Sequence, residues 1–438
     1  MDMTMQRNIN ADLMRWMHAG SRKPLIIRGA RQVGKTYTVK EFGKNNFINC
    51  VVLDFERDRS VHSVFQKDLK PDKIVQELEI YTESRIVPGK TLLFFDEIQA
   101  CERALMSLRY FYEEMPGLHV LAAGSLLEFA MDFISFPVGR VTFEWMRPMT
   151  FKEFLQAAGK EILAENIPGM FEEKSVPHVA HQAIMEQLRA YCIVGGMPQA
   201  VQAFIATGSL TEVKKIHDDI LQSYVQSLVK YNAKAHIESL EYVMTTVPAQ
   251  VGSQIKYTHL DRDRRIEVTK TSLKILEKAL LVHVIHSTHA SGLPLGAGAH
   301  AKIFKPLFLD IGLMQHICGL DPKESLSAAD LTGIYRGAIA EQFVGQELLA
   351  AGGSENNKLY YWSRLKKGSS AEVDFVIARN GKIIPIEVKS GSAGRMRSLH
   401  VFFAENPHVE KGYVLSSTTH ERQVVDKCLF LPLYLGWG

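Results

Sequence analysis

The first third of the chain alternates short, continuously apolar runs with segments of helical pattern. Apolar runs occupy residues 25–27, 47–55, 92–95 and 119–123, and a helical pattern at 35–42 follows the first of them. Apolar strands that are separated by helices are typical of a parallel sheet covered on both faces. The pattern therefore predicts an α/β domain built on a parallel sheet.

The hydrophobic pattern changes after Phe151. Residues 151–227 are mainly amphipathic helix, with an interruption at Gly195-Gly196-Met197-Pro198. Further helices follow from about residue 240, and segment 280–309 has the pattern of two strands around a glycine-rich turn. This order of helices and one hairpin predicts a helical domain of the winged-helix type.

A third pattern begins after Gly319. A predicted helix at 338–349 precedes alternating strands, and Asn380-Gly381 between two of them is a strong hairpin signal. The aromatic residues 360–362 are predicted to fill the first of these strands rather than to stack on bases. These features predict a small α/β domain in the last part of the sequence.

The composition is that of a soluble globular protein. The chain has 438 residues, 46% hydrophobic and 23% charged, and this length predicts about two to four domains. The net charge of +3 gives no strong general attraction to nucleic acid or to membranes, so such binding requires a local patch. No apolar stretch approaches the ~20 residues that span a bilayer, and the N-terminus lacks the apolar run of a signal peptide. We therefore expect a cytoplasmic protein without membrane contact.

The cysteines and histidines indicate neither a disulfide framework nor a zinc site. Five cysteines are scattered without a C-x-x-C pair, and 16 histidines show no H-E-x-x-H spacing. An odd, scattered set of cysteines fits a reducing compartment.

Residues 29–36 match the phosphate-binding pattern G-x-x-x-x-G-K-[ST] between a predicted strand and a predicted helix. Its glycines let backbone N–H groups turn toward a phosphate at the N-terminus of the helix. Lys35 is expected to reach the β- and γ-phosphates, and the Thr36 hydroxyl to ligate Mg²⁺. The sequence thus predicts that ATP and Mg²⁺ bind at Gly29, Ala30, Arg31, Gln32, Val33, Gly34, Lys35 and Thr36.

Two carboxylates follow the predicted strand at 92–95. Ligands of open α/β sheets bind at the carboxyl ends of the strands, where Asp96 and Glu97 would lie. Asp96 is expected to hold Mg²⁺ and Glu97 to polarise the attacking water. A carboxylate beside the metal-binding aspartate favours hydrolysis over storage of nucleotide, and it weighs against a small-molecule kinase.

These motifs, Arg28–Thr36 and Phe95-Asp96-Glu97-Ile98-Gln99, resemble those of a prokaryotic family of AAA+-type ATPases with a C-terminal domain of poorly defined function. The resemblance continues through Ala123-Gly124-Ser125, residues 138–140, 149–154, 195–198 and 309–313. It implies that Ser125 senses the γ-phosphate. It also implies an arginine from a neighbouring subunit of a homo-oligomer, for which Arg140 is the first candidate and Arg109 and Arg147 are rivals.

The predicted hairpin around Asn380-Gly381 brings acidic residues together. A two-residue turn pairs Arg379 with Lys382, so that Asp374 lies across from Glu387 and Lys389 lies opposite Glu372. Like charges at such positions are destabilising, which suggests a divalent cation between them. The alternative is a solvated hairpin face with a Glu372–Lys389 ion pair.

An aspartate followed by Glu-x-Lys on the partner strand resembles the PD-(D/E)xK nuclease core. The resemblance implies that Asp374 and Glu387 hold Mg²⁺, with Glu341 as an additional acidic ligand, and that Lys389 steadies the water or phosphate. Val373 stands where the proline of the pattern would precede the aspartate.

Three parts are therefore expected. They are an AAA+-type ATPase domain with a helical lid at 1–235, a helical, winged-helix-like domain at 236–318, and a restriction-endonuclease-like α/β domain at 319–438. The leading hypothesis couples ATP hydrolysis to binding or processing of nucleic acid, DNA rather than RNA. The alternative is an ATP-dependent switch that binds a protein partner through a non-catalytic C-terminal domain.

Overall fold

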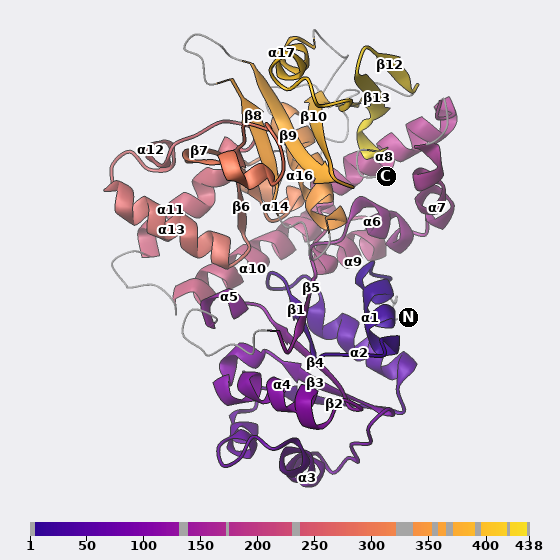
Figure 1. Cartoon of the computed structure of the whole chain (residues 1–438), viewed down its shortest axis with the longest axis vertical. Helices are drawn as coiled ribbons and strands as arrows, with labels where there is room; N and C mark the ends of the chain where they lie inside the picture. The colour runs from indigo at the N-terminus through magenta and orange to yellow at the C-terminus, as the bar shows by residue number, and fades with distance from the viewer. Residues whose placement is uncertain are drawn as a thin grey trace. The chain divides into compact units, whose positions relative to one another are not determined.

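The computed structural model describes residues 5–130, 139–171, 175–229, 237–320, 336–352, 358–364, 371–389, 396–417 and 421–435 (Figure 1). It divides into two compact units, one from Gln6 to Arg147 and one made mainly of Pro148–Gly438. Neither predicted boundary, at 235 or at 318, coincides with this division. The reason is that the helices between 151 and 228 are grouped with the residues that follow them.

The first unit has the predicted parallel sheet. In its described residues the strand order is β2-β3-β4-β1-β5, and all pairs are parallel. The strands are β1 Leu25–Arg28, β2 Asn49–Asp54, β3 Thr91–Asp96, β4 His119–Gly124 and β5 Thr142–Trp145, of which β5 was not predicted. The helices are α1 Ile9–His18, α2 Lys35–Asn46, α3 Pro71–Thr82, α4 Glu102–Glu114 and the short α5 Leu127–Ala130.

The sheet is held by a dry apolar layer, since β3 and β4 are buried along their whole length. Phe95 packs edge-to-face on Phe55 and Phe111, with ring centroids 5.6 and 6.0 Å apart. Such aromatic pairs add to the stabilisation from buried area. They fix β3, whose carboxyl end carries Asp96 and Glu97.

The second unit begins with helices. These are α6 Phe151–Ala157, α7 Glu161–Met170, α8 His178–Val194, α9 Pro198–Thr207, α10 Leu210–Leu228, α11 Ile237–Thr246, α12 Tyr257–Leu260, α13 Ile266–Lys278, α14 Ile311–Ile317, α16 Arg336–Ala351 and α17 Arg397–Glu405. Local sequence sets several of their ends. Thr150 and Glu153, for example, form a reciprocal capping box that starts α6.

A mixed sheet of eight strands runs through the described part of this unit. Its order is β12-β13-β11-β10-β9-β8-β6-β7. The strands are β6 Val282–Ser287, β7 His300–Phe308, β8 Tyr360–Ser363, β9 Glu372–Arg379, β10 Lys382–Lys389, β11 Gly412–Ser416, β12 Gln423–Val425 and β13 Cys428–Pro432. The predicted hairpin β9–β10 is confirmed, with Asn380 and Gly381 both at positive φ (51° and 73°) as its two-residue turn requires.

The middle region does not carry a separate hairpin. Helices α11 to α13 do precede the β6–β7 hairpin, as predicted, but β6 also pairs in parallel with β8. The hairpin therefore extends the C-terminal sheet, and the predicted division at 318/319 cuts through one continuous set of hydrogen-bonded strands. Tyr361 and Trp362 on β8 are buried, as predicted for core residues.

Three sequence motifs of the second unit meet in its interior. Asp310 accepts hydrogen bonds from the Gly196 N–H at 2.6 Å and from the Gly312 N–H at 3.0 Å, the latter at the start of α14. A Cβ on Gly196 would lie 2.1 Å from the Met149 carbonyl oxygen. Glu347 on α16 accepts the Phe151 N–H at 2.9 Å. The motifs around 149, 196 and 310 thus form one packed junction.

All five cysteines are free, as expected. In the described ranges, no helix combines the length and apolarity that a bilayer crossing would require.

Candidate functional site

The phosphate loop joins β1 to α2, as predicted. Gly34 has φ +95°, in the left-handed region that favours glycine. Gly29 is required for a different reason, because a Cβ at this position would lie 2.2 Å from the Met146 carbonyl oxygen. Ala30 and Val33 are buried and anchor the loop, whereas Gln32, at φ 62°, is exposed. Arg31 lies 3.8 Å from Glu56.

Lys35 folds over the loop that precedes it. Its Nζ donates to the carbonyl oxygens of Gly29 at 2.9 Å and Ala30 at 2.8 Å. Burial lowers the pKa of Lys35 to about 8, against the opposing effect of Glu97 and Asp96. An anionic phosphate at the loop would supply the counter-charge that this buried ammonium otherwise draws from two carboxylates.

Asp96 lies at the carboxyl end of β3, next to Asp54 at the end of β2. Burial raises the pKa of Asp96 to about 6, while a hydrogen bond from the Thr36 side chain lowers it. The Thr36 hydroxyl and the Asp96 carboxylate are therefore neighbours. These oxygens fit a nucleotide-bound Mg²⁺, because hard divalent cations prefer oxygen ligands and keep several waters.

Glu97 is held by its neighbours. Its Oε2 accepts hydrogen bonds from Ser125 Oγ at 3.1 Å and from Gln99 Nε2 at 2.6 Å. Its backbone is left-handed, at φ 48°, a conformation that costs energy in a residue other than glycine and that is concentrated at functional sites. The structure thus brings together the predicted Lys35, Thr36, Asp96, Glu97 and Ser125.

The three candidate arginines have different surroundings. Arg140 pairs with Glu113 at 2.7 Å, and Arg109 pairs with the same carboxylate at 3.1 Å. Burial lowers the pKa of Arg147 to about 10, and its guanidinium lies 5.8 Å from the centre of the Trp145 ring. Of these, Arg140 and Arg109 are exposed cations within reach of solvent.

Sequence reasoning missed two residues that shape this site. Arg7 donates to the carbonyl oxygen of Val33 at 2.7 Å and to that of Arg147 at 2.6 Å, which ties the phosphate loop to the segment after β5. Gln99 holds Glu97, although it lies in the motif that the sequence singled out. No local sequence pattern predicts the role of Arg7, because its hydrogen-bond partners are backbone carbonyl groups distant in the sequence.

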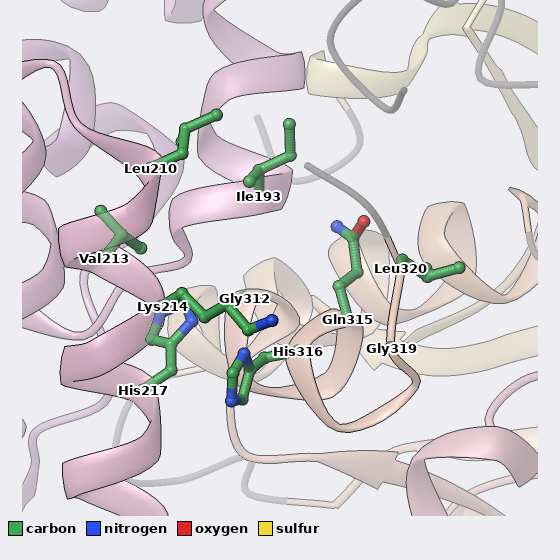
Figure 2. Close-up of a pocket in the computed structure, with 10 residues that line it drawn as sticks. All are labelled: Ile193, Leu210, Val213, Lys214, His217, Gly312, Gln315, His316, Gly319 and Leu320. Carbon is green, nitrogen blue, oxygen red and sulfur yellow. The ribbon is translucent and has the colours of Figure 1, made fainter. Parts of the chain in front are cut away.

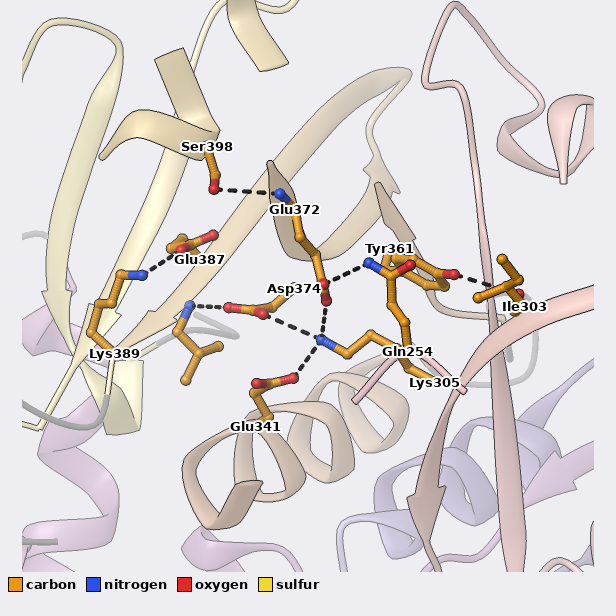
Figure 3. A network of polar contacts seen from close by, with 11 residues as sticks. Gln254, Ile303, Lys305, Glu341, Tyr361, Glu372, Asp374, Glu387, Lys389 and Ser398 are labelled. Carbon is orange, nitrogen blue, oxygen red and sulfur yellow. Dashed lines mark hydrogen bonds and ion pairs between the residues drawn. The ribbon is translucent and has the colours of Figure 1, made fainter. Parts of the chain in front are cut away.

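The C-terminal carboxylates also come together, but around a residue that was not predicted. Figure 3 shows Lys305 of β7 between Glu341, Glu372 and Asp374. Its Nζ lies 2.6 Å from Glu341, 2.7 Å from Glu372 and 3.3 Å from Asp374. Burial alone would lower the pKa of Lys305, but the three carboxylates raise it well above its ordinary value.

The alternative interpretation of the hairpin expected an ion pair between Lys389 and Glu372. The structure does not contain this pair. The β9–β10 register is the predicted one down to Phe375 and Ile386, and Asp374 then accepts the Val388 N–H at 2.8 Å. Lys389 instead pairs with Glu387 on its own strand. Burial and the nearby Asp374 raise the pKa of Glu387 to about 7.

The predicted metal ligands Glu341, Asp374 and Glu387 each contact a lysine. No three His, Cys, Asp or Glu side chains in the described ranges are grouped so as to hold a metal ion. Lys305 lies between Glu341 and Asp374, while Lys389 pairs with Glu387.

A separate cavity of about 160 Å³ lies among α8, α10 and α14 (Figure 2). The rings of His217 and His316 are 5.5 Å apart at its wall, and His316 also contacts Asp218 at 2.7 Å. Burial lowers the pKa of His217 to about 4, so this imidazole stays neutral. None of the predicted site residues lines the cavity.

Comparison with protein families divides the chain into three stretches. Residues 21–155 match the AAA domain family AAA_14. Residues 185–324 match the domain of unknown function DUF8612, and residues 336–435 match the domain of unknown function DUF4143. No curated protein matches the sequence.

Solved structures give distant similarities. The Walker-type ATPase PABY2304 of Pyrococcus abyssi is 12% identical, over 72% of this chain and 96% of that chain, with a TM-score of 0.45. The RuvB Holliday junction branch migration motor of Thermotoga maritima is 15% identical, over 64% and 89%, with a TM-score of 0.31. AMPPCP-bound DnaA from Aquifex aeolicus is 12% identical, over 61% and 86%, with a TM-score of 0.26.

The phosphate loop, the Asp96-Glu97 pair and the family match agree on the first unit. The nuclease-like nature expected for the last part is not among these matches. The chain carries an AAA-type P-loop ATPase domain, followed by regions of the DUF8612 and DUF4143 families.

Proposed function

We propose that the chain is a Mg²⁺-dependent ATP hydrolase that couples hydrolysis to binding of DNA. The observation that carries the hydrolase part is the position of Glu97 next to Asp96 and Thr36, at the sheet edge where the phosphate loop begins. A carboxylate in this place can accept a proton from a water that attacks the γ-phosphate.

The roles of the chain's residues follow from their chemistry. The loop N–H groups and Lys35 bind the phosphates, and Thr36 with Asp96 would hold Mg²⁺, which neutralises phosphate charge. Glu97 orients the water, and Ser125, whose hydroxyl donates to Glu97, can exchange this contact for the γ-phosphate. Arg140 is proposed to complete the site of a neighbouring subunit, which requires that its pair with Glu113 opens.

The DNA part rests on the exposed face of α13 and on exposed cations in the segment that precedes it. Thr269, Ser272, Leu273 and Leu276 bury one side of α13, which leaves Lys270 and Lys274 exposed one helical turn apart. Exposed cations outnumber exposed acids between 256 and 274, with Lys256, Arg262, Arg265, Lys270 and Lys274 against Asp263 and Glu267. A basic helix that is followed by a hairpin is one arrangement that reads a DNA groove.

Two measurements test this proposal. Steady release of phosphate from ATP and Mg²⁺ without an added acceptor is expected, and its absence would contradict the hydrolase. Fluorescence anisotropy with double-stranded DNA should show binding that weakens with salt. Lys270→Gln with Lys274→Gln should reduce the slope of log K against log salt by about 2.

The control is Lys67→Gln with Lys90→Gln, which removes the same charge from exposed lysines of the first unit. Equal loss in both double variants would mean that only net charge matters and would contradict a DNA-binding face on α13. No binding to DNA at low salt, with ATP hydrolysis intact, would overturn the DNA part in favour of an ATP-dependent switch for a protein partner.

A further inference from the structure

The carboxylate cluster of the second unit contains its own cation. Lys305 is 2% exposed and therefore has almost no access to water. A buried ammonium must be paired, because the cost of removing a charge from water is otherwise large. The Lys305 ammonium has three N–H donors, and three carboxylates surround it, from Glu341, Glu372 and Asp374. The donors and acceptors are matched.

The carboxylates are also engaged on their other sides. The second oxygen of Glu372 accepts a hydrogen bond from Gln254 Nε2 at 2.6 Å. The second oxygen of Asp374 accepts the Val388 N–H at 2.8 Å. Glu341 lies close to the backbone of Gly252, where an added Cβ would approach Glu341 Oε1 to 3.1 Å. Little of the cluster is left for another ligand.

A divalent cation would need the carboxylate oxygens that already contact Lys305. Mg²⁺ requires about six oxygens in near-octahedral geometry at about 2.0–2.1 Å. Glu387 Oε2 is buried without a hydrogen-bond partner in the described part of the chain, and this oxygen could join such a shell. The oxygens of Asp374 and Glu341 that would complete the shell face Lys305 instead.

We propose that Lys305 is a built-in counter-cation that occupies the position of a divalent metal, so that this cluster binds such metals only when the ammonium is removed. Its three carboxylate partners come from α16 and β9, whereas Lys305 comes from β7. The lysine therefore also fastens the β6–β7 hairpin to the C-terminal sheet.

The test measures Mn²⁺ binding to the full chain without nucleotide, by electron paramagnetic resonance, in an Asp96→Asn background that weakens the ATPase site. In this background, adding Asp374→Asn should not change Mn²⁺ binding, because the cluster around Lys305 is expected to hold no Mn²⁺. Lys305→Ala should add one site with at least tenfold tighter binding than the background. Asp374→Asn combined with Lys305→Ala should abolish the added site.

Lys302→Ala is the matched control, because Lys302 is an exposed lysine on the same strand, and it should add no site. If Lys305→Ala does not fold, Lys305→Met keeps the volume of the side chain and tests the same point. The wild-type chain also tests the proposal, and this test does not depend on whether the Lys305 variants fold. Mn²⁺ binding or Mg²⁺-dependent DNA cleavage by the wild type that is lost in Asp374→Asn would overturn the proposal, as would a Lys305→Met protein that folds but gains no site.

Discussion

Ser125 Oγ donates a hydrogen bond to Glu97 Oε2 across 3.1 Å, and this bond joins the ends of the neighbouring strands β3 and β4. Gln99 donates to the same oxygen at 2.6 Å. With these two side-chain donors and the Ser125 N–H, at 3.4 Å, on one carboxylate oxygen, the Glu97 side chain is held in one position. A water that is to be polarised must compete with these donors for the carboxylate.

Glu97→Gln should separate binding from hydrolysis. The amide keeps the size of the side chain but cannot accept a proton, and a positioned general base contributes about 10²–10⁴-fold to rate. We expect hydrolysis to fall by at least ~100-fold, with little change in ATP affinity. Glu102→Gln, at an exposed glutamate close by in the sequence, should leave both quantities unchanged. Normal hydrolysis in Glu97→Gln would remove this residue from the mechanism.

Lys35→Ala should weaken ATP binding itself. The buried ammonium contacts the carbonyl oxygens of Gly29 and Ala30 in the loop, and an anionic phosphate is its expected counter-charge. We expect at least a tenfold rise in Kd, which corresponds to about 1.4 kcal/mol, in a calorimetric titration with ATP and Mg²⁺. Lys40→Ala, at an exposed lysine of the same helix, is the control. Full affinity in Lys35→Ala would contradict the phosphate-loop assignment.

Arg140→Ala tests whether an arginine acts between subunits. The variant should bind ATP normally but hydrolyse it at least about tenfold more slowly, since such arginines stabilise transition-state charge. Mixing Arg140→Ala with Glu97→Gln should restore part of the activity, because a mixed oligomer contains sites with both intact residues. Arg109→Ala, which removes the other partner of Glu113, should not behave in this way. A mixture as inactive as its components would exclude the assignment.

Glu347→Gln should change how stability depends on pH. Burial raises the pKa of Glu347 to about 8, against the opposing Phe151 N–H, while Glu153 raises it further. The folded state therefore holds a proton that the unfolded state releases near pH 4.5. The stability that this proton contributes is fully present below about pH 4.5 and is lost as pH rises through about 8, and each pKa unit is worth about 1.4 kcal/mol.

Glutamine mimics the protonated acid at every pH. Thermal unfolding should therefore show similar stability of Glu347→Gln and wild type at pH 5, and a growing advantage of the variant up to pH 8.5. Glu165→Gln, at an exposed glutamate, should follow the wild type throughout. A constant difference between Glu347→Gln and wild type over this range would mean that Glu347 is ionised in the folded protein.

Much of the nucleotide site could be predicted from the sequence because it depends on local patterns. The loop of residues 29–36 and the Asp96-Glu97 pair are contiguous, and parallel strands bring their carboxyl ends to one edge. The turn at Asn380-Gly381 fixed the register of β9 and β10 in the same way. In each case a few adjacent residues determine the geometry.

The carboxylate cluster could be predicted only in part. The hairpin turn placed Asp374 near Glu387, but the decisive cation comes from Lys305, 69 residues before Asp374 in the sequence. Lys305 reaches the cluster because β6 pairs with β8. This is a parallel contact between strands that are distant in the sequence, and no turn motif predicts it. A lysine between Phe304 and Pro306 in an apolar run was the available signal, since a charge within a buried strand needs a partner.

The pairing of β6 with β8 also bears on how this chain can be inherited. The regions that match DUF8612 and DUF4143 are separate in sequence, yet the first supplies Lys305 and the edge strand partner of the second. Recombination that joined residues 336–435 to a foreign partner would leave Glu341, Glu372 and Asp374 without their cation, and β8 would keep β9 but lose its other neighbour, β6. These two regions are therefore expected to be inherited together, because carboxylates of the second neutralise the buried Lys305 of the first.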